Sequence, residues 1–372
     1  MKCRSFRRVF AYINLWGLRL TLFKVLGRLR LGFIRFLPLK KRNILVIGCG
    51  QFAFSSLMPN LLKNFFFSPI RYAYDIDKKN MITFCKTFRC EPLDDILSFS
   101  KKEINLAYIC SSHSSHFEYT QQLLKSNINV YCEKPLTTSI EQVYELYSII
   151  KQYNSKIYAG YNRPHSPLIT NIKERFLKHK PNNLNILCSI YGHYLENNHW
   201  YRDPNQGSRI YGNLSHWIDL ANHIMNWPLE KPKKISIEIS YLDDKYQDEN
   251  LICILKSSNS ITMNLNFYAL FEPFLGVHET IEFSSNCFNA RINNFKKLEF
   301  ESKNDYKNTS YSQKNAGHRQ AISQPISNEY RDPREFLMSE ILTYYIWQMT
   351  LNKNTFFELN YEKEYEKLNK IY

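Results

Sequence analysis

Short apolar runs alternate with helix-like stretches through the first half of the chain. Each run is an unbroken series of apolar and β-branched residues, which is typical of a parallel strand buried on both faces. The runs lie at 43–47, 70–75, 106–110 and 129–132. Because helical patterns separate them at short spacing, right-handed crossovers predict a doubly wound parallel sheet.

From residue 185 onward, polar and apolar positions alternate instead. A period of two predicts the strands of a largely antiparallel sheet that exposes one face. Such stretches lie at 185–191, 234–241, 250–257, 260–269 and 279–284. The polar residues 302–332 predict a loop or lid, and residues 333–351 predict a helix that returns to the first domain.

These patterns predict an α/β fold of two domains, as expected for a chain of 372 residues. A doubly wound parallel sheet comes first, and an α+β domain with an open, largely antiparallel sheet follows. We place a basic amphipathic arm at 1–42, the first domain at 43–162 and the second at 163–372.

The arm concentrates the charge of the chain. Residues 1–42 hold twelve Lys and Arg and no acid, out of a net charge of +15, and the first acidic residue is Asp75. The remaining body is nearly neutral, which argues against a nucleic-acid-binding protein. The longest uncharged run of the arm, Val9–Leu18, is too short to span a membrane, and no cleavage site of a signal peptide follows it.

Two interpretations of the arm remain open. Its cations are interleaved with Leu, Phe and Trp, so it can lie on an anionic membrane with its apolar side in lipid. Alternatively, it is an amphipathic helix packed on the body or on a second subunit. Gly17, Gly27 and Gly32 predict several short helices rather than one.

The nine cysteines are scattered, and no two form a CxxC pair. Several of them, such as Cys49, Cys110 and Cys132, lie in or beside strand-like runs. This pattern predicts buried thiols in the cytoplasm, and neither a disulfide framework nor a metal site.

The first apolar run leads into a glycine-rich turn and then a helix. The turn reads GCGQFA, with Gly48, Gly50 and Ala53 in GxGxxA spacing around Gln51 and Phe52. Gly48 permits a tight turn, Gly50 lets the backbone approach a pyrophosphate at the helix N-terminus, and Ala53 lets the helix pack on the strand. Together the five residues predict the phosphate-binding turn of a Rossmann dinucleotide site.

The second apolar run ends in Asp75, 27 residues after Gly48. A carboxylate there accepts hydrogen bonds from ribose hydroxyls and repels a 2′-phosphate, so Asp75 predicts NAD as the cofactor. Asp77 is a competing carboxylate, and Lys78 and Lys79 leave NADP open as the alternative. A turn-initiating aspartate is the other interpretation of Asp75.

Polar residues also gather where the later strands end. Ser111 and His116 follow the third run, and Glu133, Lys134 and Pro135 follow the fourth. Ligands of doubly wound sheets bind beyond the carboxyl ends of the strands, so these side chains are expected to face the same crevice as the glycine turn. A strand end marked only by charge and proline is the alternative.

Several segments, in their order and spacing, resemble the glucose-fructose oxidoreductase, inositol dehydrogenase and MocA family of NAD(P)-dependent oxidoreductases. The resemblance covers about residues 43–270, and members from bacterial surface-polysaccharide pathways look most similar. It rests on the segments GCGQFA, CSSHSSH, EKPLTTS, GYNRPHSP and GSRIYGNLSHWIDL.

The resemblance implies that Lys134 is a catalytic lysine between nicotinamide and the substrate hydroxyl, followed by a proline that is commonly cis. His216 matches the family's catalytic histidine, but Gly212 stands where the family has an aspartate. More of the acid–base work would then fall on Lys134 and His216. Arg163 is implied to lie near the cofactor or substrate. The candidate substrate residues are Tyr161, Tyr201, Arg202 and Asn213.

These inferences predict an NAD-dependent oxidoreductase that moves hydride between a sugar, or a nucleotide sugar, and nicotinamide. Its expected place is the cytoplasm, with peripheral contact to an anionic membrane through residues 1–42. The resemblance also implies a homo-oligomer. The alternative is a non-catalytic protein of the same fold that senses NAD or a sugar, which the missing aspartate favours.

Overall fold

The computed structural model describes residues 2–30, 34–40, 42–62, 67–96, 98, 103–242 and 246–370. The chain forms two compact units. The first, called the Rossmann unit, comprises Tyr12–Gly160 and His318–Pro333. The second, called the sheet unit, comprises Met1–Ala11, Tyr161–Gly317 and Arg334–Tyr372.

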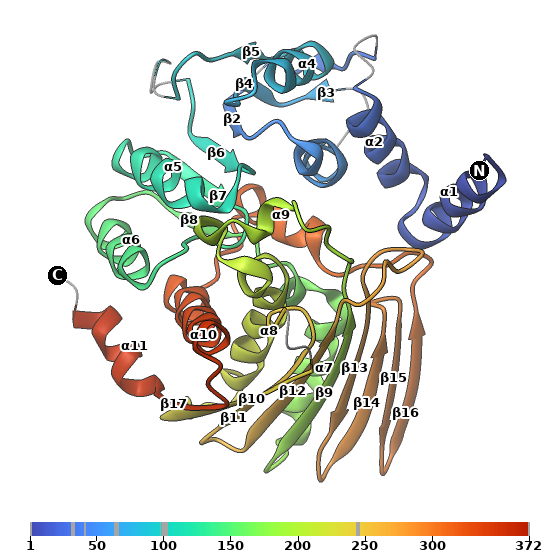
Figure 1. Ribbon diagram of the computed structural model, residues 1–372, viewed down its shortest axis with the longest axis vertical. Helices are drawn as coiled ribbons and strands as arrows, with labels where there is room; N and C mark the ends of the chain where they lie inside the picture. The colour runs from blue at the N-terminus through green and yellow to red at the C-terminus, as the bar shows by residue number, and fades with distance from the viewer. Residues whose placement is uncertain are drawn as a thin grey trace. The chain divides into compact units, whose positions relative to one another are not determined.

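Within its described residues, the Rossmann unit has a six-stranded sheet in which every pair is parallel. The strand order is β5-β4-β2-β6-β7-β8, the order of a dinucleotide-binding sheet (Figure 1). This confirms the predicted doubly wound sheet. The strands are β2 (Ile44–Ile47), β4 (Ile70–Tyr74), β5 (Glu91–Pro92), β6 (Leu106–Ile109), β7 (Asn129–Cys132) and β8 (Ile157–Ala159).

Helices pack beside these strands and bury an aromatic core. Phe54, Phe84 and Phe88 form its centre, with ring centroids 4.6–5.4 Å apart. The helices are the π-helix η1 (Ala53–Leu57), α3 (Met58–Leu61), α4 (Lys78–Phe88), α5 (His113–Lys125), α6 (Ile140–Gln152) and α9 (His318–Ser327). A small parallel pair joins β1 (Leu37–Pro38) to β3 (Phe67–Ser68).

The arm forms two helices, α1 (Lys2–Trp16) and α2 (Leu18–Leu29). Gly17 separates them with a φ of 85°, as the sequence predicts. Gly27 instead lies inside α2, where a Cβ atom would stand 2.7 Å from Cβ of Phe54. Its missing side chain therefore permits close packing of α2 on η1 within the Rossmann unit. Gly32 lies outside the described residues.

The described part of the sheet unit contains a nine-stranded sheet in the order β16-β15-β14-β13-β9-β12-β11-β10-β17. All pairs are antiparallel except β9 with β12. The alternating burial along β12 confirms the predicted period of two. The strands are β9 (Leu184–Tyr191), β10 (Lys234–Tyr241), β11 (Leu251–Ser257), β12 (Ile261–Tyr268), β13 (His278–Ser284), β14 (Phe288–Asn293), β15 (Lys297–Ser302), β16 (Asp305–Ser310) and β17 (Phe356–Asn360).

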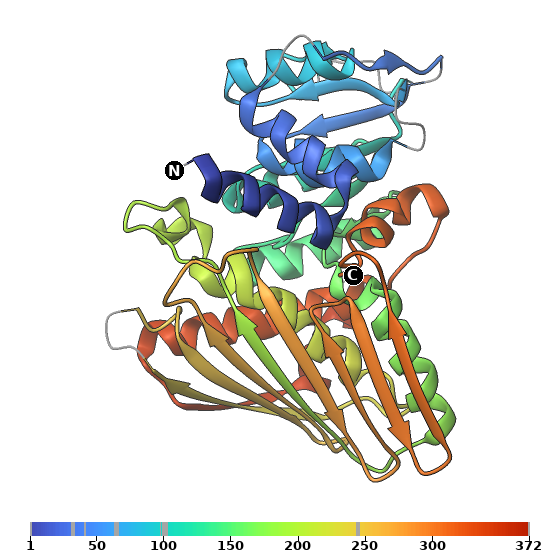
Figure 2. The same cartoon turned by 90° about the vertical axis from the view of Figure 1, so that its right-hand side faces the viewer.

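Helices cover one face of this sheet, and the other face is turned toward the viewer in Figure 2. Their apolar sides fill the space above the buried positions of the strands. The helical segments are α7 (Pro167–His179), α8 (Ser215–Met225), α10 (Pro333–Asn352), α11 (Tyr361–Lys370), the π-helix η5 (Ile210–Leu214) and the 3₁₀ turns η2 (Arg163–His165), η3 (Trp200–Arg202) and η4 (Pro204–Gln206).

One expectation about the C-terminal third needs correction. Residues 302–332, expected as a loop or lid, contain β16 and α9. β16 is an edge strand with almost every side chain exposed, so it lacks the alternation that marked the other strands. Helix α10 packs on α8, where Ser339 donates to Asp219 at 2.8 Å, whereas α9 belongs to the Rossmann unit.

The eight cysteines whose side chains are described are all free, and six of them are buried. Within the described residues, no helix combines the length and apolarity that crossing a membrane requires.

Candidate dinucleotide and sugar site

The glycine turn follows β2 directly and is held against the next strands. Gly48 has a φ of 87°, and its N–H donates to the carbonyl of Tyr74 at 2.9 Å. A Cβ atom at Gly48 would stand 2.5 Å from the backbone N of Ser111. Only glycine therefore fits this position, and the turn lies against the segment after β6. Ala53 is fully buried at the start of η1.

The space above Gly50 is open. A Cβ atom built there would meet no heavy atom of the described residues within 4 Å, in contrast to Gly48. The following residues, Gln51 and Phe52, begin the helical segment that continues as η1. Backbone N–H groups at such a helix start attract an anion. The turn thus has both the room and the donors that a pyrophosphate needs.

Asp75 lies at the end of β4 and binds the glycine turn. Its Oδ2 accepts a hydrogen bond from the N–H of Cys49 at 2.7 Å, and its Oδ1 accepts from the N–H of Asp77 at 2.8 Å. Each carboxylate oxygen can accept a second hydrogen bond, so ribose hydroxyls remain possible partners. Asp77 is instead the N-cap of α4, where it accepts from the N–H of Lys79. The structure separates the two carboxylates that the sequence left as competitors.

His116 joins the ends of two neighbouring strands. Its Nδ1 lies 2.6 Å from the carbonyl oxygen of Pro135, and its Nε2 lies 3.1 Å from that of Ser111. Burial lowers the pKa of His116 to about 4, so the ring is neutral near pH 7. A neutral ring carries one N–H, so it donates to one of the two carbonyls, and the shorter distance favours that of Pro135. The ring thereby lies between the segments after β6 and β7.

Glu133 and Lys134 leave the end of β7 and are both nearly buried. Tyr131 donates to Glu133 Oε1 at 2.8 Å, and the N–H of Lys134 donates to Oε2 at 3.4 Å. Burial raises the pKa of Glu133 to about 7, against the lowering effects of Tyr131 and Lys134. Gly160 makes room for this carboxylate, because a Cβ there would be 2.9 Å from it. The Lys134–Pro135 peptide bond is cis.

In the sheet unit, His216 lies in the first turn of α8, and its ring meets that of Tyr161 edge to face at 6.4 Å. Tyr161 is fully buried and donates its hydroxyl to Glu340 at 2.8 Å. Asn213 lies in η5, and its Oδ1 is buried with no hydrogen-bond donor among the described residues. Asp219 accepts a hydrogen bond from Ser339 inside the unit.

The position expected to hold an aspartate is filled by an aromatic ring. Gly212 has no side chain, and the ring of Tyr201 occupies the place of its Cβ, with Cε2 at only 2.4 Å from it. The Tyr201 hydroxyl donates to the Gly212 carbonyl at 3.3 Å. The sequence carries no signal for this contact, because the two residues are eleven positions apart and the 3₁₀ turn η4 lies between them.

Arg163 and Arg202 are committed to carboxylates of the sheet unit. Arg163 donates to Glu279 at 2.8 Å and lies over the ring of Trp217 at 3.9 Å. Arg202 donates to Glu249 at 2.6 Å. These contacts give both arginines a structural role. The sequence did not single out either carboxylate, since each lies far along the chain from its partner.

Glu279 is the centre of a buried ion cluster. Lys314 Nζ lies 3.0 Å from its Oε1, whereas Arg163 contacts its Oε2. Burial alone would raise the pKa of Glu279, but the two cations lower it to about 2. Burial lowers the pKa of Lys314, and Glu279 opposes that shift.

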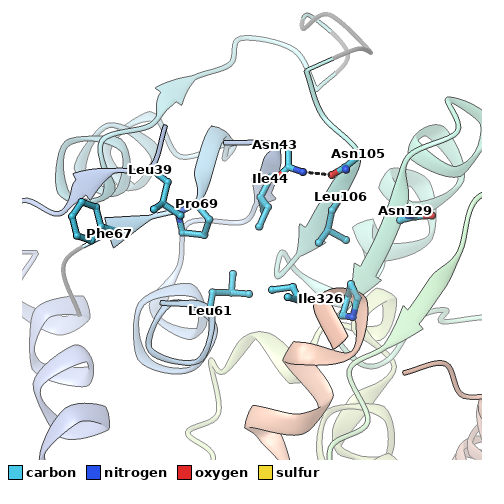
Figure 3. A pocket seen from close by; sticks show the side chains of 11 residues that line it. Leu39, Asn43, Ile44, Leu61, Phe67, Pro69, Asn105, Leu106, Asn129 and Ile326 are labelled. Carbon is cyan, nitrogen blue, oxygen red and sulfur yellow. Dashed lines mark hydrogen bonds between the residues drawn. The ribbon is translucent and has the colours of Figure 1, made fainter. Parts of the chain in front are cut away.

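A separate pocket of about 490 Å³ lies at the amino ends of the strands of the parallel sheet. Ile44, Leu106 and Asn129, which line it, are the first residues of β2, β6 and β7 (Figure 3). Asn43 donates to Asn105 at its rim, at 2.8 Å. Ligands of this fold bind at the carboxyl ends of the strands, so this pocket is distinct from the glycine turn.

The sequence-predicted residues thus form two groups. Those of the Rossmann unit gather at the carboxyl ends of β2, β4, β6 and β7; they are Gly48, Gly50, Gln51, Phe52, Ala53, Asp75, Ser111, His116, Glu133 and Lys134. Those of the sheet unit lie in or near η2, η3, η5 and α8; they are Tyr161, Arg163, Tyr201, Arg202, Asn213 and His216.

Comparisons with known proteins agree with this architecture. Residues 42–161 match the model of an oxidoreductase family with an NAD-binding Rossmann fold. Glucose-6-phosphate 3-dehydrogenase of Bacillus subtilis is 25% identical over 195 residues, which are 50% of this chain and 52% of that protein. The matched segments span about half or less of the length of the curated relatives.

Solved structures share the fold over most of the chain. The dehydrogenase MviM of Clostridium difficile is 22% identical with a TM-score of 0.65, covering 83% of this chain and 99% of its own. KijD10, a 3-ketoreductase of Actinomadura kijaniata in complex with NADP and TDP-benzene, is 13% identical with a TM-score of 0.66, covering 84% and 98%.

The parallel sheet and its glycine turn define the class of Rossmann-type dinucleotide-binding folds. Within that class, residues 42–161 match the model of the glucose-fructose oxidoreductase, inositol dehydrogenase and MocA family, and the fold resembles that of the MviM dehydrogenase.

Proposed function

We propose that the protein is an NAD-dependent dehydrogenase that acts on a CH–OH group of a sugar or nucleotide sugar. The observation that carries the proposal is the bond between Asp75 and the glycine turn. It sets a carboxylate for ribose hydroxyls beside the open space over Gly50. Glu133 and Lys134 follow the end of β7, which lies in the same sheet with β6 between it and β2.

The fit of the dinucleotide follows from these groups. Gly50, Gln51 and Phe52 would hold the pyrophosphate, and Asp75 the adenosine ribose. When bound, nicotinamide supplies the hydride acceptor or donor of the reaction. The Asp75 carboxylate favours NAD, because it would repel a 2′-phosphate. Among related folds, KijD10 holds NADP and GenD2 of gentamicin A biosynthesis holds NAD.

Lys134 and His216 are the proposed acid–base pair for the alcohol and ketone forms of the sugar. During oxidation, one of them takes the hydroxyl proton; during reduction, the same group returns it. Glu133, whose carboxyl is buried next to Lys134, would adjust the charge around the lysine as it titrates. His116 holds the backbone after Lys134 in place through Pro135.

A non-catalytic sensor of the same fold is the second candidate. The ring of Tyr201 over Gly212 favours it, because that place cannot hold the carboxylate that the family resemblance implies. Mass spectrometry of small molecules retained on the purified protein tests both candidates. A sugar recovered with a dinucleotide, and converted when the other redox form of the dinucleotide is added, supports the enzyme. Retention without conversion supports the sensor.

The cytoplasm is the proposed location, on the strength of the free buried thiols. We also propose a homo-oligomer, as in the family that the sequence resembles. Neither the location nor the oligomeric state changes the proposed chemistry of the reaction.

Peripheral contact with an anionic membrane completes the proposal. Helix α2 buries Phe23 and Gly27 on one side, yet Leu18, Leu22, Val25 and Leu29 stay 38–61% exposed on the other. Their spacing of four, three and four residues makes one apolar stripe, called the α2 stripe. No acid precedes Asp75 in the sequence. Anionic lipid complements this charge, whereas a second copy docking through the same stripe would bring like charges together.

A further inference from the structure

Arg30, the residue that ends α2, reaches the glycine turn from outside the family-matched region. Its backbone adopts a φ of 48°, and its Nη1 donates to the carbonyl of Cys49 at 2.9 Å. The guanidinium also lies over the ring of Phe54, 4.6 Å from its centre. A cation from the arm thus lies at the turn between Gly48 and Gly50.

Cys49 connects Arg30 to the ribose carboxylate. The carbonyl of Cys49 accepts from Arg30, and its N–H donates to Asp75 at 2.7 Å. The two charged side chains are therefore held on opposite polar atoms of one residue. Partial burial lowers the pKa of Arg30, and the charges of Asp75 and Asp77 oppose that shift.

The position of Arg30 depends on the contacts that α2 makes with the residues after the glycine turn. Gln51 donates from Nε2 to the carbonyl of Lys24 at 3.2 Å, one turn and a half before Arg30. Gly27 lies between these contacts and lets the helix approach Phe54 closely. The last turns of α2 therefore contact the segment after Gly50 in three places. These are Lys24 with Gln51, Gly27 with Phe54, and Arg30 with Phe54.

We propose that Arg30 is a cofactor-binding residue for the adenosine end of the dinucleotide and that it contacts the 2′-phosphate of NADP. This inference rests on the proposed dinucleotide function and refines its specificity. A guanidinium forms strong, directional hydrogen bonds with phosphate. Held on the same residue, Cys49, as Asp75, its charge offsets the repulsion between that carboxylate and a 2′-phosphate. The chain is thereby expected to bind NADP measurably as well as NAD.

The test is calorimetric titration of NAD and NADP into the full-length protein and its variants. For Arg30→Gln we expect the affinity for NADP to fall about tenfold or more, the range of one charge-assisted hydrogen bond. The affinity for NAD should change less than about threefold on the same reasoning. Arg28→Gln, an exposed change on the same helix, is the matched control and should leave both affinities unchanged. Arg30→Lys should retain part of the NADP affinity.

The outcomes separate the two claims. An unchanged ratio of NADP to NAD affinity in Arg30→Gln, with the fold intact by circular dichroism, overturns the role of Arg30 alone. Should Arg30→Gln unfold, the ratio measured in Arg30→Lys decides instead. Failure of the wild-type chain to bind either dinucleotide contradicts the proposed function itself. A smaller NADP affinity at high salt in the wild type, with no such dependence in Arg30→Gln, would support the contact.

Discussion

The ring of Tyr201 occupies the place where a side chain of Gly212 would begin. A Cβ at Gly212 would lie 2.4 Å from Cε2 of Tyr201 and 2.7 Å from its Cζ. The two positions are therefore matched, since the tyrosine fits only because the glycine has no side chain. This contact accounts for the departure of the chain from the family pattern at this point.

Gly212→Asp should destabilise the protein because the new side chain collides with the Tyr201 ring. Overpacking of this kind costs about 1–3 kcal/mol. Combining it with Tyr201→Ala should recover part of that loss, so the two changes are non-additive. Combining Gly212→Asp with Tyr201→Phe retains the ring, so this double variant should not recover stability. Urea unfolding of Gly212→Asp, Tyr201→Ala and the two double variants measures their free energies of unfolding. Additive losses would contradict the matched pair.

Glu279→Gln should cost about 3–5 kcal/mol of unfolding free energy, because it leaves Arg163 and Lys314 without their buried anion. The control is Glu282→Gln on the same strand, whose exposed pair with Arg291 should contribute at most about 1 kcal/mol. Similar losses of unfolding free energy in both variants would show that the buried cluster stabilises the protein no more than an exposed ion pair does.

The same carboxylate should make stability depend on acid pH. The pKa of Glu279 is lowered from 4.5 to about 2, so the folded state binds fewer protons than the unfolded state. Its stabilisation is complete above about pH 4.5 and is lost as the pH falls through about 2. The stability gap between wild type and Glu279→Gln should therefore narrow from pH 7 to pH 3. A constant gap would contradict this shift.

Glu133 should produce the opposite dependence. Burial raises its pKa from 4.5 to about 7, so its contribution is present below about pH 4.5 and is lost as the pH rises through 7. Glu133→Gln retains an acceptor for Tyr131 but cannot ionise. Relative to wild type, this variant should gain stability between pH 5 and pH 8. Parallel curves for the two proteins would show that Glu133 ionises without penalty.

The α2 stripe should bind anionic lipid. Full-length protein is expected to sediment with acidic liposomes at low salt and to be released at high salt. Leu22→Gln with Leu29→Gln should abolish sedimentation without lowering the melting temperature, because both residues are exposed. Leu187→Gln with Leu351→Gln, two exposed leucines outside the arm, is the control. If the Leu22 and Leu29 changes altered the oligomeric state instead, the stripe would be a subunit interface.

The parallel sheet could be predicted because its strands are continuous apolar runs next to recognisable turns. β7 at Asn129–Cys132 and β10 at Lys234–Tyr241 have the bounds that the pattern gave. The exposed edge strand β16 could not be found, since nothing buries it and its residues need no alternation. Short strands such as β8 are too brief to show a period.

The site residues also divide into those that a local motif predicts and those that depend on tertiary packing. Asp75 and Gly48 could be found because a local motif fixes their spacing. Tyr201 over Gly212, Glu279 between Arg163 and Lys314, and Arg30 at Cys49 depend on tertiary packing between distant segments. A single sequence carries no periodic signal for such contacts.

Lys134→Met tests the central claim most directly. The account predicts that NAD affinity stays within a few-fold while turnover of the retained sugar falls about a hundred- to ten-thousand-fold, the usual cost of losing a general acid–base group. His216→Gln should also be slow, and the double variant should be little worse than the slower single one. Thermal unfolding serves as the control for folding. A Lys134→Met protein that reduces NAD with its sugar at the wild-type rate would contradict the account.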